Sequence, residues 1–376
     1  MLSLASGHCV VDMVVGAIPA LLPLFVRQYG LSDLAASMIL GASLLASSAI
    51  QPVFGVIADR RGADWLLYGG AAVGAVMMAL SGIAGSYAAV LALIVASGLG
   101  IAAYHPEAAR VANRIGGDRP ATGVAWFMVG GSVGFALGPL IAAATMPLMG
   151  IRSTLVFAVP GVAVGILLFT RRGRLRPPAR HAHHAAMAGP SHIPGLSLLL
   201  VVTTLRTWAE FGLLALAPLL FVSHRGMSEG AAGMAVFAFS AAGAVGTVLG
   251  AGLADRFGGR RIMVWSTPLS APLVVGAAVL SAPWAIACMT GAGLIMLATF
   301  SVTVEMGQRY LPARLALAAG LMIGFGAIGS APPGLALAGA LADATSRQTA
   351  ILALAALPLL GGLLSVFLPE PRARVA

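Results

Sequence analysis

The stretch GVIADRRGADW at residues 55–65 recurs in altered form as GAGLADRFGGRR at residues 250–261. The aspartates of the two copies, Asp59 and Asp255, are 196 residues apart in a chain of 376 residues. An internal repeat of this kind defines an architecture before any single motif does. The two copies therefore predict a chain built from two versions of one unit.

Polar residues inside apolar stretches repeat with nearly the same period. Three pairs share a separation of 198 residues: His8 with Arg206, Asp12 with Glu210, and Glu107 with Glu305. Independent landmarks thus agree on the duplication.

The composition indicates an integral membrane protein. The chain is 59% hydrophobic and only 9% charged, with a mean hydropathy of +0.96, whereas soluble domains are about 45–50% apolar. Apolar runs recur along its whole length, each close to the roughly 20 helical residues that cross a hydrocarbon core of about 30 Å. We expect the lipid bilayer as a partner and, despite a net charge of +10, no nucleic acid.

The hydropathy pattern predicts an all-α membrane protein with twelve transmembrane helices in two pseudo-symmetric six-helix bundles. The predicted spans are 3–26, 34–57, 65–85, 88–110, 120–145, 151–170, 196–221, 231–253, 262–281, 284–306, 316–341 and 348–368. The predicted bundles cover residues 1–170 and 196–376, and the segment 171–195, rich in Arg, Pro and His, is the predicted linker. Its HAHH run at 181–184 has no acidic or cysteine partner nearby, so we expect a solvated basic loop there and no metal site.

The arginines predict the orientation in the membrane. Seventeen of the 22 fall in loops that share one side with the N-terminus. Four fall in the opposite set of loops: Arg27, Arg152, Arg225 and Arg347. Cytoplasmic loops carry the excess of basic residues, so both termini are predicted to be cytoplasmic in a multi-pass protein of a bacterial inner membrane.

The buried charges fall on the first and fourth helix of each predicted bundle. An ionisable side chain in hydrocarbon costs about 2.5–3.5 kcal/mol on insertion scales, and such groups normally face a bundle interior or a water-filled cavity. At 1.5 Å per residue, Asp12 and Glu107 are expected at similar depths. The pattern predicts one shared aqueous cavity. The alternative is a set of separate structural ion pairs.

The stretch YHPEAAR at residues 104–110 carries several of these groups. Glu107 and Arg110 are three residues apart, so they share one helix face, while His105 points elsewhere. Pro106 is expected to break or kink the span and to leave a backbone carbonyl free.

Three stretches together resemble one branch of a known family: GHCVVDMVVGAIPALLP at 7–23, QPVFGVIADRRG at 51–62 and YHPEAAR at 104–110. They resemble the fosmidomycin-resistance branch of the major facilitator superfamily over essentially the whole chain. The resemblance implies a proton-driven secondary transporter with drug export as its activity, and we expect the chain to be a monomer. After Gly62, however, Ala63 and Asp64 stand where the family's loop motif usually continues with basic residues.

GFALGPL at 134–140 partly matches a glycine-proline motif that the resemblance associates with antiporters. Gly134, Gly138 and Pro139 keep its spacing, but Ala142 and Ala143 replace later glycines. Close helix packing explains the same glycines equally well.

The residues that we assign to the site fall into three groups. The candidate proton-coupling residues are Asp12, Glu107, His8 and His105. The candidate substrate-binding residues are Arg206, Glu210, Arg110, Tyr104, Trp126 and Trp208. The candidate gating residues are Asp59, Arg60, Asp255, Arg256 and Glu305.

Each assignment has an alternative. Exchange of a proton for a solute needs a carboxylate whose proton affinity changes with its surroundings, which favours Asp12 and Glu107 as proton carriers; both could instead be fixed ion pairs. Arg206 could hold a phosphonate or carboxylate by two-point contact or simply neutralise Glu210. Glu305 is a second titrating group or, as we favour, a charge at the cytoplasmic mouth. Trp126 and Trp208 line the cavity or pack.

The sequence therefore predicts a proton-coupled exporter of a small anionic or zwitterionic molecule. The alternatives are a proton-coupled importer of a small organic anion and a membrane sensor or lipid-handling protein on the same scaffold. No HExxH motif and no phosphate-cradling glycine-rich loop with a lysine is present, so we expect no enzyme activity, no cofactor and no metal. The expected partners are protons and a small-molecule substrate.

Overall fold

The computed structural model describes residues 1–61, 64–115, 120–175 and 190–370. Within these ranges, the side chains of residues 58–61, 113–114, 120–125, 315–316 and 327 are not described. The described residues are almost entirely helical and contain no β-strand, which confirms the predicted all-α class. Contacts divide the chain into two units, each considered by itself: unit 1 is residues 1–181 with 228–237, and unit 2 is residues 182–227 with 238–376.

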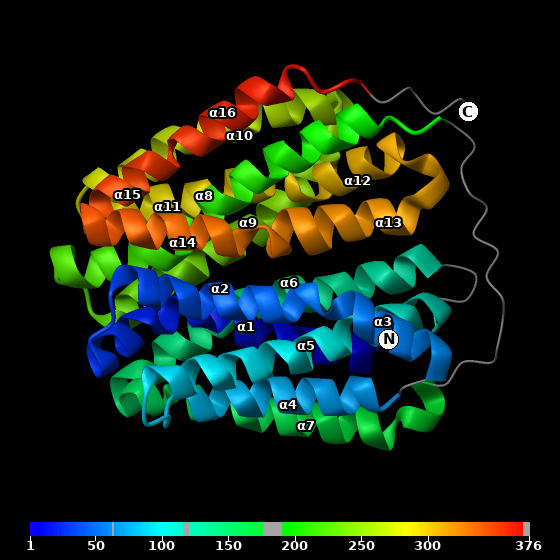
Figure 1. Cartoon of the computed structure of the whole chain (residues 1–376), viewed down its shortest axis with the longest axis horizontal. Helices are drawn as coiled ribbons and strands as arrows, with labels where there is room; N and C mark the ends of the chain where they lie inside the picture. The colour runs from blue at the N-terminus through cyan, green and yellow to red at the C-terminus, as the bar shows by residue number, and fades with distance from the viewer. Residues whose placement is uncertain (62–63, 116–119, 176–189, 371–376) are drawn as a thin grey trace. The chain divides into compact units, whose positions relative to one another are not determined.

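Unit 1 contains the helices of the first half of the chain, labelled in Figure 1. They are α1 (Leu2–Tyr29), α2 (Asp33–Ala49), α3 (Gln51–Arg61), α4 (Trp65–Ser81), α5 (Tyr87–Ile115), α6 (Pro120–Met149), the 3₁₀ segment η1 (Gly150–Phe157), α7 (Ala158–Thr170) and the 3₁₀ turn η2 (Arg172–Leu175). The beginning of α9 also contacts this unit, where Arg27 and Glu229 form an ion pair at 2.6 Å.

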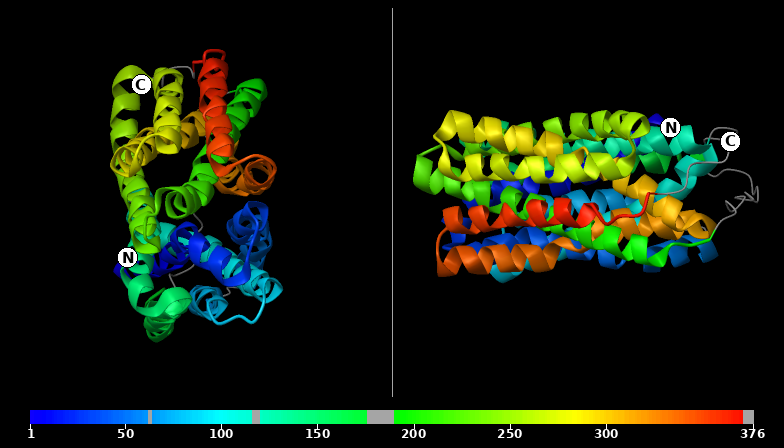
Figure 2. Two further views of the ribbon diagram at one scale, coloured as in Figure 1. Left: turned by 90° about the vertical axis from the view of Figure 1, so that its left-hand side faces the viewer. Right: turned by 90° about the horizontal axis from the view of Figure 1, so that it is seen from above.

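Unit 2 contains the remaining helices. They are α8 (Ile193–Arg225), α9 (Glu229–Phe257), α10 (Gly259–Val279), α11 (Ala282–Leu297), α12 (Phe300–Tyr310), the 3₁₀ turn η3 (Pro312–Arg314), α13 (Leu315–Ala319), the π-helical segment η4 (Gly320–Gly329), α14 (Ala331–Ala344), α15 (Arg347–Leu354) and α16 (Ala356–Ser365). Within each unit the helices run along a common direction (Figure 2).

Ten stretches of the described chain are long and apolar enough to cross a membrane. One of them, Trp126–Thr170, contains both α6 and α7, and α4 is a shorter apolar helix of 17 residues. All twelve predicted spans lie mostly on helical residues. Length and composition alone identify ten candidate stretches and not twelve.

Several predicted spans are interrupted helices. α2 gives way to α3 at Ile50, two residues before Pro52, which has no backbone N–H to donate to the carbonyl four residues earlier. α11 gives way to α12 near Thr299, whose hydroxyl donates to the Met296 carbonyl at 2.9 Å. Pro106, by contrast, lies inside the continuous helix α5, so it does not break the span, and of the two predicted effects only a kink is compatible with the structure.

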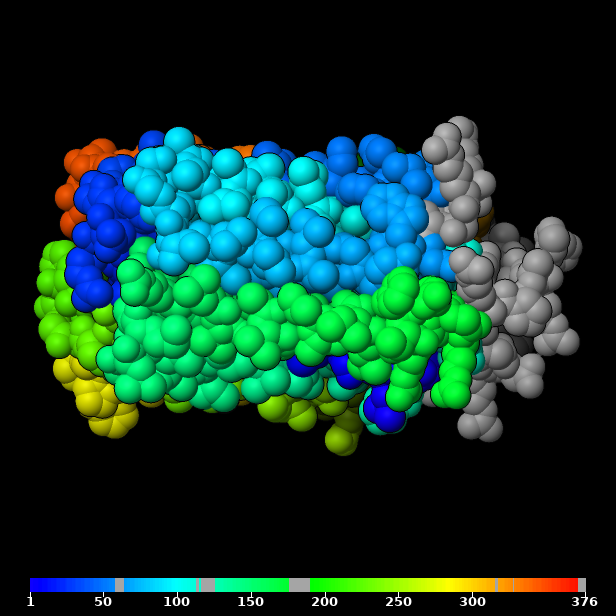
Figure 3. All heavy atoms as spheres, turned by 90° about the horizontal axis from the view of Figure 1, so that it is seen from below, coloured from blue at the N-terminus to red at the C-terminus, as the bar shows by residue number. Residues whose placement is uncertain are grey.

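The first helix of each unit is the one most enclosed by its neighbours. In the most apolar part of α1, 78% of residues are buried, and in α8 the share is 83%, against 39–50% in the other candidate spans. In unit 1, α4 packs against α7, and their side chains form a continuous outer surface (Figure 3). The polar residues His8 on α1 and Arg206 and Glu210 on α8 are accordingly buried.

Candidate functional site

The carboxylate of Asp12 lies between two imidazole rings from different helices. On α1, His8 Nε2 is 3.1 Å from Asp12 Oδ2, as expected for residues four apart on one helix. From α5, His105 Nε2 is 3.2 Å from Asp12 Oδ1. The structure thus brings together three of the four residues predicted for proton coupling.

The second nitrogen of each ring fixes where its protons must be. His8 Nδ1 is 2.8 Å from the Phe127 carbonyl oxygen, and His105 Nδ1 is 3.0 Å from the Ile101 carbonyl oxygen. A carbonyl oxygen only accepts hydrogen bonds, so both Nδ1 atoms carry a hydrogen. This assignment follows from the partners of each ring.

Each Nε2 then faces a carboxylate oxygen, and each of these contacts needs a proton of its own. With both contacts satisfied, the cluster of His8, Asp12 and His105 holds four protons and has a net charge of +1. Removing one proton makes the cluster neutral and leaves one nitrogen lone pair facing an oxygen. The ligand atoms of the three side chains lie within 4.8 Å of one another, so the site is arranged to accept a cation, whether a proton or a metal ion.

The cluster has a dry side and a more open side. The His8 side chain is 4% exposed, whereas His105 and Asp12 are 21% and 24% exposed. The Phe127 ring stacks on His8 with a centroid separation of 4.0 Å. Exchange with water is therefore favoured at the contact between His105 and Asp12.

Glycines of α6 bring its backbone against α1. An added Cβ at Gly130, Gly134 or Gly138 would collide with the backbone carbonyls of Ala5, Cys9 and Met13 respectively. Every fourth residue of α6 thus contacts every fourth residue of α1. Small residues permit such close approach of two helix backbones in membranes. Close packing accounts for the glycines of the GFALGPL motif.

Gly131 faces the cluster itself. An added Cβ would lie 2.5 Å from His8 Nε2 and 2.6 Å from Asp12 Oδ2. We therefore expect Gly131→Ala to destabilise the protein by about 1–3 kcal/mol, the usual cost of overpacking, and to reduce transport by disturbing the contact between His8 and Asp12. Thermal unfolding in detergent and transport in vesicles measure the two effects.

The matched control for Gly131→Ala is Gly252→Ala. Gly252 is exposed on α9 with nothing within 4 Å of an added Cβ, so alanine there is expected to be neutral or slightly stabilising. Equal behaviour of the two variants would contradict a special role for Gly131.

Glu107 and Arg110 form a separate, two-point ion pair on α5. Arg110 Nε donates to Glu107 Oε2 at 2.8 Å, and Nη2 donates to Oε1. Glu107 is completely buried, and it is not part of the cluster around Asp12. The geometry favours the interpretation of Glu107 as a fixed ion pair over that of a proton carrier.

In unit 2, α8 corresponds to α1 in the repeat and carries a buried ion pair with one unsatisfied donor. Arg206 Nη1 donates to Glu210 Oε2 at 2.5 Å, and the two residues are only 3% and 7% exposed. Among the described residues no acceptor meets Arg206 Nε. The next residue, Thr207, donates to the Gly326 carbonyl at 2.9 Å, which lies in η4, and π-helical segments occur frequently at functional sites.

The aromatic candidates occupy different surroundings. Tyr104 is fully buried and donates to the Leu4 carbonyl at 2.8 Å, while Trp208 donates from Nε1 to the Ser330 carbonyl at 2.6 Å. Both side chains therefore connect helices within their own unit. Trp126 is 59% exposed. The adjacent residue, Phe127, another aromatic of the same predicted span, provides both the stacking ring and the carbonyl for His8, a pairing that the sequence did not indicate.

The candidate gating residues are only partly described. The side chains of Asp59 and Arg60 and the HAHH segment lie outside the described residues. Asp255 and Arg256 are exposed at the end of α9, and the Arg256 guanidinium lies 5.2 Å from the centroid of the Phe257 ring. Glu305 forms an ion pair with Arg309 one turn further along α12.

Comparisons with known proteins match the whole chain. The family model of the Major Facilitator Superfamily matches residues 4–331 and, in a second match, 199–376. The Fosmidomycin resistance protein of Escherichia coli (strain K12) is 30% identical over 98% of this chain and 92% of that protein. The Uncharacterized MFS-type transporter YfnC of Bacillus subtilis (strain 168) is 30% identical over 96% of this chain and 91% of its own length.

More distant matches agree with these. The Multidrug resistance protein MdtG of Citrobacter koseri is 27% identical over 70% of this chain and 68% of that protein. The crystal structure of a bacterial homolog to the human lysosomal transporter Spinster, in an inward-facing and occupied conformation, superposes with a TM-score of 0.84. The superposition covers 100% of this chain and 98% of the Spinster homolog at 16% sequence identity. At this identity the likeness concerns the fold alone.

Proposed function

This chain is a membrane transporter that belongs to the Major Facilitator Superfamily, and from that premise we propose that it is a proton-coupled exporter of a small anionic or zwitterionic molecule of the fosmidomycin type. The transporter would work by alternating access, in which the substrate site opens to one side of the membrane at a time. The excess of arginines on one side supports the inner membrane as its location, with both termini in the cytoplasm.

The cluster of His8, Asp12 and His105 carries the proposal of proton coupling. Its contacts to the Phe127 and Ile101 carbonyls leave each imidazole able to share one further proton with Asp12. When one proton leaves the cluster, only one hydrogen bond is lost, and when a proton arrives, that hydrogen bond is restored. Because the net charge changes between +1 and zero, the proton occupancy of this partly buried site alters its electrostatic energy, which is what coupling to a conformational change requires.

The choice of export and of substrate class rests on two further observations. One relative that matches 98% of this chain is named for fosmidomycin resistance, and another that matches 70% of it is named for multidrug resistance. Within unit 2, the unsatisfied Nε of Arg206 is a donor suited to a phosphonate or carboxylate oxygen.

Uptake into inverted membrane vesicles tests the function directly. With fosmidomycin as the probe and an acidic vesicle interior, we expect accumulation that collapses when an ionophore dissipates the pH gradient, since an exporter in such vesicles exchanges internal protons for external solute. Vesicles without the protein are the control. Accumulation only in right-side-out vesicles with an inward proton gradient would establish the importer instead, and binding without accumulation would support the sensor or lipid-handling alternative.

A further inference from the structure

Two arginines stand at the beginning of α10, where a helix disfavours positive charge. Arg260 and Arg261 directly follow Gly259, the first residue of α10, and the first turn contains no acidic residue. The first N–H groups of a helix lack intrahelical acceptors and together resemble about half a positive charge. Arg260 donates to the Val366 carbonyl at 2.5 Å, and neither guanidinium has an ion-pair partner within the described part of the chain.

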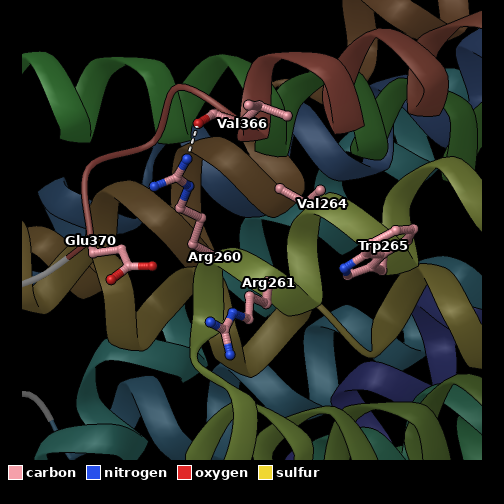
Figure 4. Close-up of a pocket in the computed structure, with 6 residues that line it drawn as sticks. All are labelled: Arg260, Arg261, Val264, Trp265, Val366 and Glu370. Carbon is pink, nitrogen blue, oxygen red and sulfur yellow. Dashed lines mark hydrogen bonds between the residues drawn. The ribbon is translucent and has the colours of Figure 1, made fainter.

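The two arginines line a cavity within unit 2 (Figure 4). Its volume is about 250 Å³, and its other lining residues are Val264, Trp265, Val366 and Glu370. In Figure 4, Arg260 reaches toward Val366, whereas Arg261 points away from it. The volume is below the roughly 300–1,000 Å³ of pockets for drug-sized ligands, so the cavity suits a small head group. Glu370 supplies one negative charge against two positive ones and the helix terminus.

An exposed apolar stripe continues from this cationic end along α10. Arg261, Trp265 and Leu269 are spaced four residues apart, which places them on one helix face. Trp265 is 75% exposed and Leu269 is 57% exposed. On α16, which packs against α10, Leu363 is also 61% exposed. In a bilayer these side chains meet acyl chains, and tryptophan is enriched at the level of the head groups.

We propose that this surface binds an anionic phospholipid. The phosphate contacts Arg260, Arg261 and the N–H groups that begin α10, and the acyl chains lie along Trp265 and Leu269. A free phosphate ion would use the cationic end and leave the apolar stripe without a partner. A zwitterionic lipid would bring a cation of its own next to the two arginines. An anionic amphiphile is the chemistry that complements both parts.

Native mass spectrometry of the purified full-length protein in detergent tests the proposal without reference to transport. Phosphatidylglycerol is titrated against wild type and against Arg260→Gln/Arg261→Gln. Each arginine near a membrane surface contributes about 1 kcal/mol, so the double variant is expected to bind about 30-fold more weakly. Trp265→Ala removes a lipid-facing side chain and is expected to weaken binding several-fold without affecting folding.

The matched control is Arg256→Gln/Arg314→Gln, which removes two exposed arginines that do not line the cavity and is expected to bind phosphatidylglycerol like wild type. An equal loss in this control would show nonspecific attraction and overturn the site. Equal binding of phosphatidylcholine would also overturn it, as would displacement of the lipid by inorganic phosphate at equal concentration.

Discussion

Replacing Asp12 by asparagine is expected to abolish proton-driven accumulation of solute while leaving the protein folded. The amide oxygen of the introduced side chain can accept from one imidazole, and its NH₂ group can donate to the other, so both contacts at 3.1 and 3.2 Å survive. The variant cluster is then satisfied with three protons on the two rings and has the same net charge of +1. The variant cluster lacks the carboxylate whose negative charge balances the remaining imidazolium when a proton leaves.

The expected size of this effect follows from the loss of the titrating carboxylate. The contacts of the cluster survive in the variant, so what is lost is the coupling to protons, and a factor of 100 in accumulation corresponds to about 2.7 kcal/mol. We therefore expect at least about a 100-fold loss of accumulation driven by the pH gradient. The measurement is the initial rate of fosmidomycin uptake into inverted vesicles.

Two controls separate loss of coupling from loss of the protein. Exchange of labelled for unlabelled solute at equal pH needs the substrate site but no net proton movement, so it is expected to persist in Asp12→Asn. His105→Gln removes the more exposed ring of the cluster and is expected to resemble Asp12→Asn. Undiminished gradient-driven uptake in both variants would remove the cluster from the mechanism.

Contacts within one helix could be predicted from the sequence. The pairs of His8 with Asp12, Arg206 with Glu210, and Glu305 with Arg309 are each four residues apart, and the 3.6-residue turn places them together whatever surrounds the helix. All three pairs are in contact. The apolar runs likewise predicted the helices. A stretch of about 20 residues in lipid can hydrogen-bond all its backbone N–H and C=O groups internally only as a helix.

Contacts between helices could not be predicted in the same way. The approach of His105 to Asp12 and the position of Phe127 depend on the register of α5 and α6 against α1. That register follows from close backbone packing, such as Gly134 against the Cys9 carbonyl, which hydropathy does not encode. The spacing placed His105 off the face of Glu107 and Arg110 but gave no indication of its partner. The resemblance pointed to α1 and α5 as important, and the structure adds that Asp12 and Glu107 have different partners.

The unsatisfied donor on Arg206 leads to the second prediction with a large expected effect. Arg206→Lys keeps the positive charge beside Glu210 but replaces the planar fork by a single ammonium group, which cannot bind an anion at two points. Hydrogen bonds to charged groups contribute about 1.5–3 kcal/mol, so we expect KM for fosmidomycin to rise about 10- to 100-fold. The measurement is the concentration dependence of uptake at a fixed pH gradient.

A neutral pair distinguishes binding from structural support. Arg206→Gln alone would leave Glu210 buried without its partner, which is strongly destabilising, whereas Arg206→Gln/Glu210→Gln removes both charges together. If Arg206 binds the anion, the double variant folds but requires much higher fosmidomycin concentrations, as Arg206→Lys does. If Arg206 only neutralises Glu210, both variants keep the wild-type KM, because the charge balance at this buried position is preserved in each.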